Sequence, residues 1–137
     1  MQERVLRILE YDKIQAMLVN EAVSEMGKSL AAELLPQQEY GEVLRLQEET
    51  AEAETLLVRL GRSPVDAFCD VRAPLKKCRA TYALSAKELL EIAKTLRCAR
   101  LCRDSLLKEE GEGPVIRRAE TLHTARRVEE EIFRCIL

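Results

Sequence analysis

The sequence predicts an all-α fold, a bundle-like core of about six to seven helices with no sheet. Apolar residues recur at helical spacing along almost all of the 137 residues, and no β-branched run is bounded by a hairpin signal such as Asn-Gly. The composition, with 47% apolar and 34% charged residues, suits a soluble globular domain rather than a disordered or membrane-spanning chain.

The first 61 residues predict three short helices and one long one. We expect Tyr11-Asp12 to be a break or a cap between the first two helices, and Ser24 can cap a third helix that stops at Pro36, because proline lacks an amide hydrogen. A coiled-coil-like seam then advances in steps of 3, 4, 3, 4 and 3 residues and ends at Gly61. The seam residues are Val43, Leu46, Thr50, Ala53, Leu57 and Leu60.

The second half begins with a loop over 61–66 and a short helix that starts between Asp70 and Pro74. Ser85 and Glu88 form a capping-box pattern for a helix that runs to about Leu107. We therefore expect a helical core domain over 1–108, a Gly- and Pro-containing linker over 109–114, and the start of one further amphipathic helix over 115–137.

The C-terminal residues Cys135-Ile136-Leu137 are apolar and carry no capping glycine. We expect the sequence to be truncated inside or just after this helix. The alternative is a tail that is buried against a partner or against the chain's own core.

Charge and cysteine content indicate the compartment. With 22 Lys and Arg against 24 Asp and Glu, the net charge of −2 gives no overall attraction to nucleic acid or anionic membranes. No apolar signal segment follows Met1, so we expect a cytoplasmic protein without membrane contact and with reduced cysteines. Cys98 and Cys102 are expected to be buried thiols rather than half of a metal site, since no further ligand pair accompanies them.

Two groups of basic residues are candidates for phosphate contact. Arg72, Lys76, Lys77 and Arg79 are close together beside a helix start, and we predict a nucleic-acid or interdomain contact there, with a solvated face as the alternative. The second group winds around its helix in steps of three residues, so a solvated face is favoured. Its members are Lys94, Arg97, Arg100 and Arg103.

The remaining polar residues give no catalytic, cofactor-binding or metal-binding assignment. His123, the one histidine, is expected on the surface or half-buried, without a nucleophile partner. The acidic clusters mix over helix faces and favour solvated positions. They comprise Glu48, Glu49, Glu52 and Glu54, and Glu129, Glu130 and Glu131. No Walker-type or dinucleotide-binding glycine loop occurs in the sequence.

Several stretches, taken in order, carry family information. They are Leu9-Glu10-Tyr11-Asp12-Lys13-Ile14, then Ala22-Val23-Ser24-Glu25-Met26-Gly27-Lys28 with Leu35-Pro36, then Glu48-Glu49-Thr50-Ala51-Glu52-Ala53, then Asp70-Val71-Arg72 with Leu75-Lys76-Lys77, then Leu84-Ser85 with Glu88-Leu89-Leu90, and Val128-Glu129-Glu130-Glu131-Ile132-Phe133-Arg134-Cys135-Ile136. Together they resemble the opening of the bacterial MutS-II proteins, MutS-family paralogues that lack the mismatch-reading N-terminal domains.

The resemblance implies the N-terminal helical core of a long, dimeric DNA-binding ATPase, with ATP and Mg²⁺ bound elsewhere in that protein. It also implies action on branched DNA in repair, suppression of homologous recombination, a C-terminal Smr endonuclease module and, for some members, rescue of stalled ribosomes. This segment has neither a Walker loop nor an Smr motif, so the resemblance assigns it no catalytic residue. The alternative is a helical nucleic-acid-binding, ribosome-binding or oligomerisation module without enzymatic activity.

Overall fold

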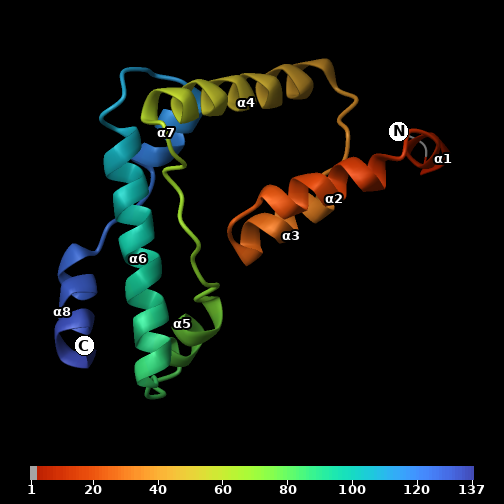
Figure 1. Ribbon diagram of the computed structural model, residues 1–137. Helices are drawn as coiled ribbons and strands as arrows, with labels where there is room; N and C mark the ends of the chain where they lie inside the picture. Colours follow the sequence, from red (N-terminus) through yellow and green to blue (C-terminus); the bar gives the residue numbers. More distant parts are fainter. Residues whose placement is uncertain (1–2) are drawn as a thin grey trace.

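The computed structural model describes residues 3–137, which form eight α-helices and no β-strand (Figure 1). The all-α prediction is confirmed. The helices are α1 Glu3–Ile8, α2 Tyr11–Glu21, α3 Glu25–Glu33, α4 Tyr40–Leu60, α5 Arg72–Arg79, α6 Ala86–Leu106, α7 Pro114–Glu120 and α8 Arg126–Ile136. None of them combines the length and the apolar character that a membrane crossing requires. Helix α4 crosses the top of Figure 1, α6 runs down from it, and α8 lies beside α6.

The N-terminal helices pack as a chain of neighbours, α1 on α2 and α2 on α3. Two short helices separated by a break are found as predicted, but the break lies at Leu9-Glu10, where Glu10 has a left-handed φ of 53°, and Tyr11-Asp12 begins α2. The predicted Ser24 cap is confirmed, because its hydroxyl accepts a hydrogen bond of 3.0 Å from the Gly27 amide.

Helix α3 ends at Glu33, earlier than the predicted stop at Pro36. Side chains of α2 satisfy carbonyl groups at this end: the Tyr11 hydroxyl donates to the Leu34 carbonyl at 2.8 Å, and the Gln15 amide donates to the Ala32 carbonyl at 2.7 Å. Terminal carbonyls of a helix need partners outside the helix, so these bonds stabilise both the helix end and the α2–α3 pair.

Helix α4 ends as predicted at Gly61, which has a φ of 67° and donates its amide hydrogen to the Leu57 carbonyl at 3.0 Å. The predicted seam is wrong in one respect. Leu56 is buried, with 4% exposure, whereas the seam residue Leu57 is 45% exposed. The reason is tertiary: α7 packs against α4 on the side that carries Leu56.

The apolar core lies where α4, α6 and α7 meet. It is a small cluster made by residues from all three helices, with no member from α8. Its buried residues are Leu56, Cys102, Leu106, Ile116 and Ala119. Leu60, Val65, Leu107 and Val115 pack against the cluster from its edge.

The segment 115–137 contains two helices, so the prediction of a single helix there is wrong. The chain leaves helical structure over 122–125, although no glycine or proline marks the break. Packing decides the division, because α7 contacts α4 and α6 while α8 runs along α6. The domain boundary at 109–114 stays a prediction; helices before and after it share the apolar core. Leu137 is exposed.

The Glu52 carboxylate of α4 caps the start of α7, which corrects the expectation of a solvated side chain. It accepts hydrogen bonds from the amides of Val115 at 2.6 Å and Ile116 at 3.4 Å. A carboxylate is favourable there because the first amides of a helix lack partners within it. A Cβ atom on Gly113 would lie 2.3 Å from the Glu52 carboxyl carbon, so only glycine leaves room for this cap. The neighbouring Glu49 accepts from Arg118 at 2.8 Å.

Replacement of Glu52 by alanine should lower the free energy of unfolding by about 1–2 kcal/mol, because the α7 amides lose their cap. The matched control is Glu48→Ala, which removes an exposed carboxylate from the same helix and should change stability by less than about 0.5 kcal/mol. Urea unfolding of the three proteins measures both effects. Equal stability of the two variants would contradict the cap.

Candidate nucleic-acid or interdomain interface

The predicted basic cluster lies on α5, a short helix that leads into α6. Pro74 occupies the first turn of α5, where a missing amide hydrogen costs nothing, and it is buried. After α5 the chain turns at Thr81, whose φ is 62°, and enters α6 through the predicted capping box. In this box the Ser85 hydroxyl accepts from the Glu88 amide at 3.2 Å, and the Glu88 carboxylate accepts from the Ser85 amide at 2.9 Å.

The structure places all four predicted cations on α5 with exposed side chains, but in different electrostatic settings. The Arg72 guanidinium pairs with Asp70 at 2.6 Å, and the Lys77 ammonium pairs with Glu88. Neither Lys76 nor Arg79 forms an ion pair with the described residues 3–137. The cluster therefore offers two uncompensated charges to a partner rather than four.

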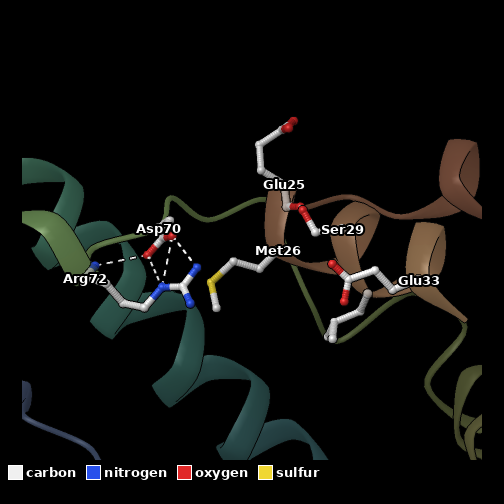
Figure 2. A pocket seen from close by; sticks show the side chains of 7 residues that line it. Glu25, Met26, Ser29, Glu33, Asp70 and Arg72 are labelled. Atoms are coloured by element: carbon white, nitrogen blue, oxygen red, sulfur yellow. Dashed lines mark hydrogen bonds and ion pairs between the residues drawn. The ribbon is translucent and has the colours of Figure 1, made fainter.

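Arg72 borders a pocket of about 310 Å³ between α3 and the start of α5 (Figure 2). Figure 2 shows Met26 of α3 extending toward the Arg72 guanidinium. The same guanidinium donates hydrogen bonds to the Asp70 carboxylate. The far wall carries Glu25 and Glu33. Because the Arg72 guanidinium is already held by Asp70, it would have to leave this carboxylate to bind a phosphate.

Both carboxylates that pair with the cluster have a lowered pKa. Hydrogen bonds from the Arg72 side chain and backbone lower the pKa of Asp70 to about 2. The Lys77 hydrogen bond, followed by the bonds from Ser85, lowers the pKa of Glu88 to about 2. Both carboxylates are therefore ionised at neutral pH.

The second basic group has a different role from the one predicted. The Arg97 and Arg100 side chains of α6 both donate to the Glu129 carboxylate of α8, at distances of 2.9–3.0 Å. Glu129 is only 1% exposed, so the expectation of a solvated face is wrong at Glu129 and at Arg100. Hydrogen bonds from Arg100 and then Arg97 lower the pKa of Glu129 despite its burial. No local sequence signal identifies this contact, because the paired residues are about thirty positions apart.

The cysteines and the histidine are placed largely as expected. Cys98 and Cys102 are buried on α6, and His123 is exposed. Burial raises the pKa of the Cys102 thiol, which disfavours the reactive thiolate. Cys98 and Cys102 line an apolar cavity of about 310 Å³ together with Val65 and Phe68. Within residues 3–137, no three His, Cys, Asp or Glu side chains are grouped so that they could hold a metal ion.

The Lys77→Ala variant should raise the pKa of Glu88 from about 2 toward its ordinary value of 4.5, while the pKa of Asp70 stays at about 2. Because the folded-state pKa of Glu88 lies below its unfolded value, its ion pair stabilises the fold above pH 4.5. This stabilisation is lost as the pH falls toward 2. Carbon-13 NMR of the side-chain carboxyls follows both titrations, and an unchanged Glu88 curve would refute the pair.

Curated proteins named Endonuclease MutS2 are similar to nearly the whole chain. The identity is 37% over 139 residues for the protein of Brevibacillus brevis, covering 99% of this chain. It is 37% over 140 residues for that of Geobacillus sp. and 36% over 141 residues for that of Alkaliphilus metalliredigens. The chain spans about 18% of the length of each of these relatives.

No protein-family model matches the chain. The relatives nevertheless cover 99–100% of it at 36–37% identity, so the alignment extends well beyond a single motif. The family resemblance that the ordered motifs predict is confirmed: over its whole length, this chain is related to one region of the bacterial Endonuclease MutS2 proteins.

Proposed function

We propose that this chain forms the N-terminal helical core of a MutS-family ATPase and couples the nucleotide state of that protein to its nucleic-acid clamp. The observation that carries the proposal is the similarity of the whole chain to Endonuclease MutS2 proteins of which it spans about 18%. The longer protein would act as a homodimer on branched DNA and recombination intermediates, suppress homologous recombination, and act on stalled ribosomes.

The uncovered apolar surface of the described helices supports a role in contact with further protein. Large apolar side chains that a stable globular unit would bury are open on several helices, among them Ile14 and Met17 on α2, Leu30 on α3 and Val58 on α4, with exposures of 59–77%. Apolar side chains that are open to water can be buried by contact with another protein surface. Other domains of the longer protein would cover it.

The chemistry belongs, in this proposal, outside the described residues. The sequence contains no Walker-type glycine loop, and no three His, Cys, Asp or Glu side chains within residues 3–137 are grouped as metal ligands. ATP, Mg²⁺ and the Smr endonuclease module are therefore proposed for the rest of the longer protein, and no step of this chain involves them. In this proposal, the chain holds and orients the helices that connect the ATPase to the nucleic-acid clamp of the longer protein.

The proposal predicts a difference between two purified proteins, this 137-residue chain and the complete product of its source gene. The complete product should hydrolyse ATP and retain a four-way DNA junction in a gel-shift assay, whereas the chain alone should hydrolyse no ATP. ATP turnover by the chain, or a source gene that encodes no P-loop, would refute the proposed assignment.

A second candidate function is a direct nucleic-acid or ribosome contact through α5. The exposed and uncompensated Lys76 and Arg79 favour it, since they lie three positions apart on one helix. Arg72 and Lys77 would support such a contact only after leaving their carboxylate partners.

If α5 binds phosphates, the variant Lys76→Ala/Arg79→Ala should bind a four-way DNA junction more weakly. The slope of log affinity against log salt concentration should also fall by about 2, because each phosphate contact releases close to one counterion. The control is Arg117→Ala/Arg127→Ala, which removes the same charge from exposed sites on α7 and α8 and should leave the slope unchanged. Equal slopes for both variants, or no salt dependence in the parent chain, would exclude this function.

A further inference from the structure

The contact between α6 and α8 depends on a charged group rather than on apolar burial. Among the residues of α8, Glu129 is the only one that is buried. Ile132 and Phe133 are half-buried, and Val128 is 51% exposed. Ile136 is half-buried as well, so no apolar side chain of α8 is fully buried, and the carboxylate occupies the position that a leucine or isoleucine would take in an ordinary helix pair.

Both oxygens of the Glu129 carboxylate are held by α6. The Arg97 Nε donates to Oε1 at 3.0 Å, the Arg100 Nε donates to Oε2 at 3.0 Å, and a terminal nitrogen of Arg100 donates to Oε1 at 2.9 Å. The Arg97 guanidinium also lies 4.0 Å from the centre of the Phe133 ring, a cation–π contact. Four side chains thus form the centre of the α6–α8 contact.

Helix α8 is connected to the rest of the molecule in a way that allows it to separate. The apolar core of Leu56, Cys102, Leu106, Ile116 and Ala119 contains no residue of α8. Residues 122–125, which join α7 to α8, have no helical or strand structure. Removing α8 from α6 therefore takes no side chain out of this five-residue cluster and does not require α7 to unwind.

We infer that α8 is a hinged arm, docked on α6 by the Glu129 carboxylate and able to leave α6 while α4, α6 and α7 remain packed. A buried carboxylate is stable only while its charged partners are in place. Removal of one partner leaves a buried charge without compensation, which is strongly destabilising. Docking is therefore a two-position arrangement: the carboxylate is either held by both guanidiniums or returned to water. Undocking exposes Arg97 and Arg100 on α6 and Phe133 on α8. The inference rests on these contacts and not on the proposed function.

The test is hydrogen exchange measured by mass spectrometry on the full chain and on Glu129→Gln, which keeps the side-chain size but removes the charge. Amide protection over 126–136 should fall by about 100-fold, because an interrupted buried ion pair is strongly destabilising. Protection over 40–60, 86–106 and 114–120 should stay as in the parent chain. Arg97→Gln leaves one guanidinium in place and should give a smaller loss over the same residues.

The matched control is Glu130→Gln, which removes a neighbouring exposed carboxylate whose ion-pair partner, Arg126, lies on the same helix. It should leave the protection of α8 unchanged. Two results would overturn the inference. Full protection of 126–136 in Glu129→Gln would mean that apolar contacts dock α8, and a parallel loss of protection in α4, α6 and α7 would mean that α8 is an inseparable part of the core.

Discussion

The apolar contact among Leu56, Leu106 and Ile116 joins three helices that are far apart in the sequence. Burial of such side chains removes apolar surface from water and is the main favourable contribution to folding. Because α4, α6 and α7 contribute one residue each, the contact fixes how these helices meet. Helix α5 leads into α6, α8 packs along α6, and the chain enters α4 from the α1–α3 group (Figure 1).

Two carboxylates stabilise helix contacts in addition to the small apolar core. Glu52 satisfies the first amides of α7, and Glu129 is held by two guanidiniums of α6. The two groups do different work: Glu52 fixes the helix that belongs to the core, whereas Glu129 fixes a helix that lies outside it. The exposed apolar residues of α2 and α4 fit a segment that works within a larger protein, which is the setting proposed from its relatives.

Local features of the fold were predictable and distant pairings were not. Ser24, Gly61 and the Ser85–Glu88 box act within four residues of themselves, so their sequence patterns are sufficient to place helix ends. The break before α8 carries no glycine or proline and results from packing. For the candidate site, the sequence indicated which cations share a helix. The carboxylates that neutralise Arg72 and Lys77 became identifiable only in the structure, because ion pairing depends on side-chain geometry.

The arrangement of α4, α6 and α7 depends most on the contact between α4 and α7 in the core. A double-mutant cycle of Leu56→Ala and Ile116→Ala tests this contact directly. Residues in contact change stability non-additively, so urea unfolding of the two single variants and the double variant should give a coupling energy of at least about 0.5 kcal/mol. Additive losses, with a coupling energy near zero, would show that the two side chains do not share a core and would contradict the arrangement of the three helices.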